Sequence, residues 1–212
     1  MLLHLALGSR ESYDAWLGFL HEMVARGLRE PVLAITDGQP GLKKALAEVF
    51  PGVRRQRCLV HKMRNILAKV PRAIQAEMKH LVRQVFEVPT YEEGERRAQA
   101  LIARFRGRYP SAMERLADDL EACLEHLRFP EAHRKRIRTT NLLERLFGEG
   151  KRRTKVIPRF PGEAACLRLV FATLVKASES WHGVKMTPEI LRGLDQLRRQ
   201  GAREPDKELV AI

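Results

Sequence analysis

Two acidic residues lie in sequence contexts that favour the binding of a divalent metal ion. Asp37 follows the apolar segment 31–36 and precedes Gly38, so it would lie at the carboxyl end of a strand, where open α/β sheets place ligand and metal sites. Glu144 is an acid within a strongly basic segment, an arrangement that suits a carboxylate holding Mg²⁺ beside a phosphate backbone. Each has a simpler interpretation. Asp37 could stabilise its own turn, and Glu144 could complete a capping box with Asn141.

Two C-x-x-H pairs offer another kind of chemistry. Cys58 with His61 and Cys123 with His126 could together supply four zinc ligands. Neither pair lies in the short loops that zinc sites favour, and Cys123 falls in an apolar helical stripe typical of a core. The first pair could instead shape the site next to the segment that carries Arg57.

The basic charge is concentrated in two strips. The 212 residues carry a net charge of +13, with 39 Lys and Arg against 26 Asp and Glu. Segment 51–72 holds seven basic and no acidic residues, and segment 134–155 holds nine basic and two acidic residues. Arginine-rich strips suit bidentate contacts with phosphate, so a nucleic acid is the expected partner. The cations predicted to contact it are Arg57, Lys62, Arg64, Lys151, Arg152 and Arg153.

The first 61 residues alternate between strand and helix patterns. Such alternation predicts a mostly parallel sheet covered by helices, and hence an α/β fold class. After His61 the pattern is helical and no further strand is predicted. The expected strands are 2–7, 31–36 and 55–60, and the expected helices are 11–26, 40–49, 62–68, 73–88, 91–106, 110–127, 141–151, 161–181 and 188–200.

Several classes of protein are excluded by composition and motif. No apolar run is long enough to span a bilayer, so no membrane partner is expected. The N-terminus does not resemble a signal peptide, and three cysteines do not make a disulfide scaffold, so a cytoplasmic location is expected. The sequence contains no P-loop, G-x-S-x-G, G-x-G-x-x-G or H-E-x-x-H motif.

Six short motifs, taken in order, resemble the Mutator-type transposases of bacterial insertion sequences. The resemblance extends from about Glu11 to Trp181. Its motifs are Asp37-Gly-Gln-Pro-Gly-Leu, Phe50-Pro, Gln56-Arg-Cys-Leu-Val-His61 with Arg64-Asn-Ile-Leu, Thr139-Thr-Asn-Leu-Leu-Glu144-Arg, Lys151-Arg-Arg-Thr and Phe160-Pro.

This resemblance implies an RNase H-like core with a large all-helical insertion, and a DDE triad that binds two divalent metal ions, Mg²⁺ or Mn²⁺. Asp37 would be the second carboxylate and Glu144 the third. Cys58 and His61 would be the family's C-x-x-H signature, and Lys151 the basic residue after the catalytic Glu. The implied reaction is cleavage of DNA at the element's ends, followed by attack of the freed 3′-OH on target DNA. A homo-oligomer is implied for the full-length protein.

The resemblance also predicts a division into domains and an incomplete core. Residues 1–61 would be a partial RNase H-like core, 62–133 the helical insertion, and 134–212 the C-terminal helices that complete the core. The family's first catalytic Asp lies upstream of Met1, and Asp14 does not match its motif. We therefore expect an N-terminally truncated chain that lacks the first strand and is inactive alone. Two alternatives are a non-catalytic DNA-binding fragment of a transposase and a basic helical nucleic-acid-binding protein.

Overall fold

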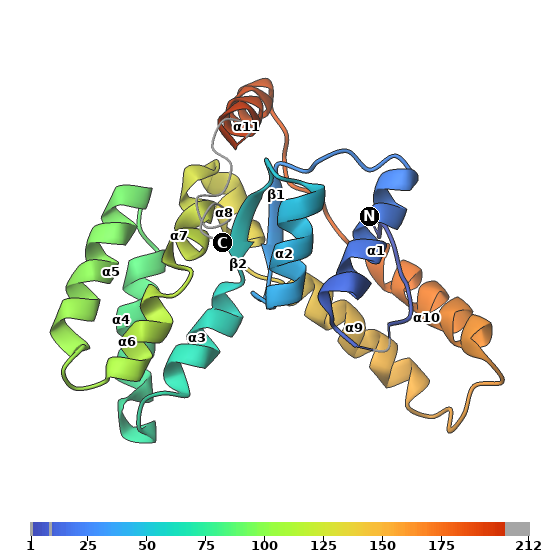
Figure 1. The fold of residues 1–212 in the computed structure, drawn as a ribbon, viewed down its shortest axis with the longest axis horizontal. Helices are drawn as coiled ribbons and strands as arrows, with labels where there is room; N and C mark the ends of the chain where they lie inside the picture. The colour runs from blue at the N-terminus through green and yellow to red at the C-terminus, as the bar shows by residue number, and fades with distance from the viewer. Residues whose placement is uncertain (1, 9, 202–212) are drawn as a thin grey trace. The chain divides into compact units, whose positions relative to one another are not determined.

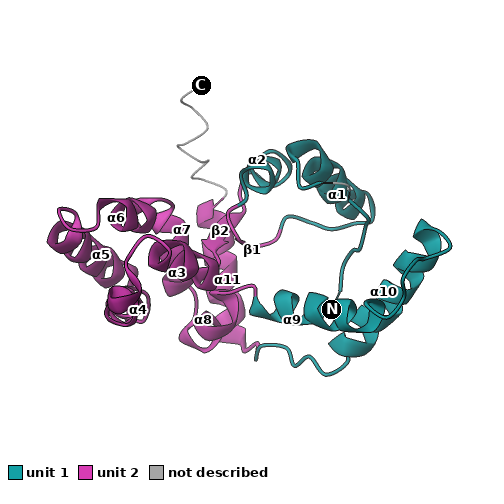
Figure 2. Cartoon of the chain, turned by 90° about the horizontal axis from the view of Figure 1, so that it is seen from below, with its two compact units in different colours: residues 1–30, 39–51, 141–185 teal, residues 31–38, 52–140, 186–212 magenta. Residues whose placement is uncertain are grey.

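The computed structural model describes residues 2–8 and 10–201, which form two compact units (Figure 1). Each unit is assembled from three separate segments of the chain, as Figure 2 shows. Unit 1 comprises residues 1–30, 39–51 and 141–185, and unit 2 comprises residues 31–38, 52–140 and 186–212.

A two-stranded parallel sheet lies in unit 2. Strand β1 (Leu33–Thr36) pairs with β2 (Arg54–Arg57), and Thr36 is in register with Arg57. Two of the three expected strands and their parallel pairing are therefore confirmed. The prediction that the second of these strands continues to residue 60 is wrong, because Cys58 is already the N-cap of the next helix.

The expected strand at residues 2–7 does not form. This segment is irregular, and within the described residues only β1 and β2 pair in a ladder. His4 instead contacts helix α1 (Tyr13–Ala25), since its ring lies 2.7 Å from a Glu22 carboxylate oxygen and packs against Phe19 with ring centroids 4.6 Å apart. The segment is therefore held against α1 by side-chain contacts and is not part of the sheet.

Unit 1 contains two pairs of helices. Ser12 caps the first helix by accepting a hydrogen bond from the Ala15 N–H at 3.2 Å, and Gln39 caps the second by accepting one from Leu42 N–H at 2.6 Å. In the second pair, the buried Leu174 packs against Gly150. The pairs are α1 (Tyr13–Ala25) with α2 (Pro40–Val49), and α9 (Asn141–Thr154) with α10 (Glu163–Ser178).

The helices of unit 2 include a group over residues 59–127 that surrounds one hydrophobic core. Ile66, Met78, Val82, Leu116 and Leu124 are among its fully buried side chains. The sequence correctly predicts the helical character of this region. The helices are α3 (Leu59–Leu67), α4 (Arg72–Phe86), α5 (Tyr91–Phe105), α6 (Pro110–Ala117), α7 (Leu120–Leu124), the 3₁₀ turn η1 (Glu125–Arg128), α8 (Glu131–Ile137) and α11 (Pro188–Gly201).

The helix expected over 110–127 is interrupted. Its apolar spacing is helical throughout, but α6 stops at Ala117 and α7 begins at Leu120. Asp119 between them has φ = 53°, the left-handed conformation that Asp tolerates better than most residues. Hydrophobic spacing alone does not reveal this break.

Gln56 joins the sheet to the helices of unit 2. Its side chain is fully buried and accepts a hydrogen bond from the His126 N–H at 2.6 Å. Its amide nitrogen donates to the Cys123 carbonyl at 3.2 Å. A buried polar side chain thus satisfies backbone groups of both α7 and η1.

Candidate functional site: the Asp37 turn and the basic helix α9

Asp37 is held on a turn at the carboxyl end of β1, as the sequence predicts. Its side chain is exposed, whereas the preceding Thr36 is buried. The Thr36 hydroxyl accepts a hydrogen bond from the Gly38 N–H at 3.3 Å, and Gly38 has φ = +84°. The carboxylate is therefore presented to solvent by a turn that requires glycine at its next position.

Arg57 lies against the same turn. Its guanidinium covers Gly38 so closely that a Cβ atom at Gly38 would overlap it. The Nε and Nη1 atoms of Arg57 are buried and have no hydrogen-bond partner among the described residues. This places a cation beside Gly38, the residue that follows Asp37.

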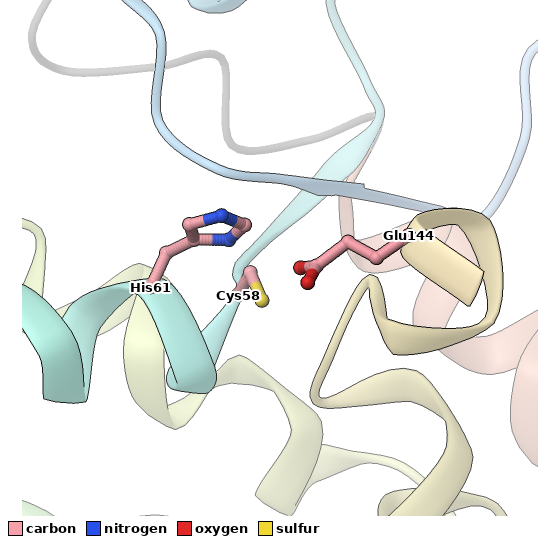
Figure 3. A group of neighbouring side chains, drawn as sticks. All are labelled: Cys58, His61 and Glu144. Atoms are coloured by element: carbon pink, nitrogen blue, oxygen red, sulfur yellow. The ribbon is translucent and has the colours of Figure 1, made fainter. Parts of the chain in front are cut away.

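The C-x-x-H pair stands directly after β2. Cys58 is buried at the N-cap of α3, and His61 is half-buried on the first turn of that helix, as Figure 3 shows. The Cys58 sulfur and a ring nitrogen of His61 lie within 4.8 Å of each other. The Cys58 sulfur also accepts hydrogen bonds from the Thr140 N–H and hydroxyl, at 3.3 and 3.2 Å.

Thr140 is a contact of Cys58 that the sequence does not predict. Its contacts with Cys58 tie the end of β2 to the segment just before Asn141. The only signal in the sequence was its position in the Thr139-Thr-Asn motif, because nothing in the local pattern indicates a partner 82 residues away.

Glu144 lies in unit 1, on the first turn of α9, and is exposed. It is the carboxylate labelled in Figure 3. The exposed Lys151, Arg152 and Arg153 lie in the last turn of the same helix, as the basic pattern predicts. Glu149 accepts hydrogen bonds from Arg152 at 2.6 and 3.1 Å and from Arg153 at 3.2 Å.

These ion pairs change the charge that α9 presents. Hydrogen bonding to Arg152 and then to Arg153 lowers the pKa of the Glu149 carboxyl. Glu149 therefore stays ionised, and it offsets one of the three positive charges at the end of the helix. Both arginines remain exposed, so further hydrogen-bond donors stay accessible to an anionic ligand.

The predicted cations of the first basic strip have different environments. Lys62 is only 3% exposed and donates its ammonium hydrogen to the Asp118 carbonyl, and burial lowers its pKa. This burial argues against the predicted contact of Lys62 with DNA. Arg54, another cation of this strip, forms a salt bridge with Glu125 at 2.8 Å and so holds β2 to the turn η1. Arg64 is exposed and remains accessible.

The four-ligand zinc interpretation is not supported by the second C-x-x-H pair. Burial raises the pKa of the Cys123 thiol to about 12, as expected for a side chain in the core. The ring nitrogens of His126 each lie 3.1 Å from a carbonyl oxygen, of Cys123 and of Phe86. Among the described residues, neither joins a group of three or more possible metal ligands.

His126 makes the stability of unit 2 depend on pH. Burial lowers its pKa to about 4, although the two carbonyls favour its protonated form, and Arg138 and Arg134 oppose protonation further. The folded state then binds fewer protons than the unfolded state below pH 6.5. The stabilisation present above pH 6.5 is lost as the pH falls through 4, by about 3 kcal/mol at most.

We expect thermal unfolding followed by circular dichroism to show this loss between pH 6.5 and 4. His126→Gln keeps a side-chain donor but cannot titrate. The unfolding temperature of this variant should therefore fall less than that of the wild type between pH 6.5 and 4. His80→Gln is the matched control, because His80 is exposed on α4 and should leave the pH dependence of the wild type unchanged. Equal pH dependence in wild type and His126→Gln would contradict the assignment.

Comparison with known proteins places these residues in a family. The family model described as "Transposase, Mutator family" matches residues 1–183, a span that includes both Asp37 and Glu144. The chain belongs to the Mutator family of transposases.

Individual relatives agree with this membership. The chain is 34% identical over 177 residues to the transposase for insertion sequence element IS6120 of Mycolicibacterium smegmatis, covering 84% of this chain and 55% of the relative. It is 35% identical over 180 residues to the transposase for ISRM5 of Rhizobium meliloti, covering 85% and 45%. For the transposase for IS256 in transposon Tn4001 of Staphylococcus aureus, identity is 31% over 175 residues, covering 82% and 45%. The chain thus spans about half the length of these relatives.

No helix among the described residues has both the length and the hydrophobicity that crossing a bilayer requires.

Proposed function

We propose that this chain is a catalytic portion of a DDE-type transposase, which cuts DNA at the ends of an insertion sequence and joins them to a target. The supporting observation is the family match over residues 1–183, which includes both proposed catalytic carboxylates. The parallel β1 and β2, connected through helix α2, fit one part of an RNase H-like core. As the family resemblance implies, the full-length protein would act as a homo-oligomer.

Asp37 and Glu144 are the proposed metal ligands. Both side chains are exposed, and carboxylate oxygens are the donors that Mg²⁺ and Mn²⁺ prefer. A bound divalent ion would supply Lewis acidity and an activated water for attack on the phosphodiester. Asp37 is positioned for this role by the Gly38 turn, and Glu144 by the first turn of α9.

The reaction provides the direct test of this proposal. Because the chain is expected to be inactive alone, the full-length protein is incubated with end-labelled DNA that carries the repeats flanking its gene, in Mg²⁺, in Mn²⁺ and in EDTA. We expect strand cleavage in either metal and none in EDTA. Cleavage that continues in EDTA, or that is unchanged when both proposed ligands are replaced, would overturn the metal-dependent mechanism.

The basic end of α9 is the proposed phosphate contact. We expect Arg152→Glu with Arg153→Glu to weaken binding to all DNA sequences alike, and to reduce the slope of log K against log salt by about 2. Fluorescence anisotropy at several salt concentrations measures both quantities. The control is Arg198→Glu with Arg199→Glu, which reverses two adjacent exposed arginines at the end of α11. An unchanged slope in the α9 variant would show that α9 is not the phosphate surface.

A further inference from the structure

A groove of about 600 Å³ opens in unit 2 beside helices α3 and α4. Both helices are labelled in Figure 1. Apolar side chains line much of it, including Leu59, Met63 and Leu67 from α3 and Phe86 from α4. Residues 138–139 complete the lining, and the Leu59 N–H donates to the Arg138 carbonyl at 3.0 Å. We call it the α3–α4 groove.

The charged side chains that line the α3–α4 groove are nearly all positive. Arg64 comes from α3, and Lys79 and Arg83 lie one helical turn apart on α4; all three are exposed. Glu87 is the only carboxylate among the lining residues, and it already pairs with Arg138 at 3.2 Å. The groove therefore combines an apolar lining with an excess of three cations.

This combination defines the chemistry of the ligand. Exposed cations attract an anionic group, and arginine binds phosphate oxygens through paired donors. The apolar lining favours a flat or hydrophobic group in contact with it. A nucleotide has both parts, and a groove of this volume is within the range of small-ligand sites.

We propose that the α3–α4 groove binds one unpaired nucleotide of a DNA strand. Its base lies against Met63 and Leu67, and its flanking phosphates contact Arg64, Lys79 and Arg83. A base inside a duplex is stacked and paired and cannot reach such a lining, so the site selects a nucleotide that has left the helix. This inference rests on the proposed function, since it assumes that DNA is the partner.

The test compares two DNA probes with the intact chain. One is a fluorescein-labelled duplex, and the other is the same duplex with a single extrahelical thymidine at its centre. We expect about tenfold tighter binding to the second probe, measured by anisotropy at one salt concentration, because a factor of ten corresponds to about 1.4 kcal/mol, the size expected for burying part of a base against an apolar lining.

Three variants localise the effect. Met63→Gln places a polar group of similar size in the lining and should reduce the tenfold preference to about one. Lys79→Ala with Arg83→Ala should also weaken binding to the extrahelical probe more than to the paired one. Arg104→Ala with Arg106→Ala removes two exposed cations at the end of α5, outside the groove, and should leave the preference unchanged. Unfolding temperatures of all variants are measured to confirm folding.

Photocrosslinking provides a second measurement that does not depend on any variant. A 4-thiothymidine at the extrahelical position should crosslink to peptides of α3 or α4, identified by mass spectrometry. Crosslinks confined to other peptides would overturn the proposal even if the preference is present.

The outcomes separate this proposal from the proposed function. If the chain binds paired DNA but shows no preference for the extrahelical probe, the groove proposal fails and the proposed function stands. If it binds neither probe, the proposed function fails and the groove proposal fails with it. If an acidic peptide binds in a Met63-dependent manner and the nucleotide does not, the groove is a protein-binding site and the proposal is overturned.

Discussion

Replacing Asp37 by asparagine is expected to lower metal-dependent strand cleavage by the full-length protein by at least about a hundredfold, and Glu144→Gln is expected to do the same. Each change removes a negative charge and a strong oxygen ligand but keeps the size of the side chain. Residues that only hydrogen-bond to a metal ligand, without touching the metal, already contribute about 10- to 100-fold to metal affinity or activity. Loss of a direct ligand should cost no less.

The same variants should fold normally. Both carboxylates are exposed and each replacement keeps the size of the side chain, so the variants should keep the cooperative unfolding transition of the wild type. Mn²⁺ binding followed by electron paramagnetic resonance gives a second measurement that does not require turnover. We expect weaker Mn²⁺ binding in each variant.

Matched controls exist on the same chain. Asp14 is an exposed first-turn acid of α1, and Glu163 is an exposed first-turn acid of α10. Asp14→Asn and Glu163→Gln should leave both cleavage and Mn²⁺ binding unchanged. If the control variants lose as much activity as Asp37→Asn and Glu144→Gln, the assignment of the two ligands is wrong.

Gly38→Ala is expected to destabilise unit 2 and to displace the Asp37 turn. Two independent effects contribute. A residue with a side chain is strained at φ = +84°, at a cost of about 1–3 kcal/mol. The new methyl group would also overlap the Arg57 guanidinium, which must then move from its buried position. Chemical denaturation measures the loss, and Mn²⁺ binding measures displacement of the Asp37 carboxylate.

A double-mutant cycle separates the two contributions. In an Arg57→Ala background the overlap is absent, so Gly38→Ala should cost less than in the wild type, and only the backbone strain remains. Gly107→Ala is the control, because a Cβ at Gly107 meets no atom within 4 Å and its φ is not in the left-handed region. If Gly38→Ala is as stable as Gly107→Ala, the turn does not require glycine.

The sequence predicts the helices of this protein far better than its sheet. Apolar residues at helical spacing identify α1, α2, α4 and α5 nearly to the residue, because each helix buries one continuous face. The run at residues 2–7 is equally apolar, but a strand also needs a partner. Its side chains contact α1 instead, and no local pattern indicates this choice.

The environment of each predicted site residue depends on tertiary contacts. Asp37 could be placed at a strand end because the residues around it fix the turn locally. The burial of Lys62 could not be predicted, since its partner is a backbone carbonyl 56 residues away. The position of Arg57 over Gly38 likewise depends on the register of two strands separated by a helix. Motif spacing identifies such residues, but it does not show whether a cation faces solvent or the interior.

The interleaving of the two units along the chain also constrains how such genes can exchange parts. Unit 1 draws its helix pairs from both sides of residues 52–140. A recombination between two related genes with its breakpoint in that stretch would take α1 and α2 from one parent and α9 and α10 from the other. Each of these helices would then come from the same parent as the helix it packs against, because α1 packs on α2 and α9 packs on α10. A breakpoint inside either pair, or inside the core that residues 59–127 form, would separate side chains that evolved together, so chimeras joined between the end of that core and residue 140 should be the ones that fold.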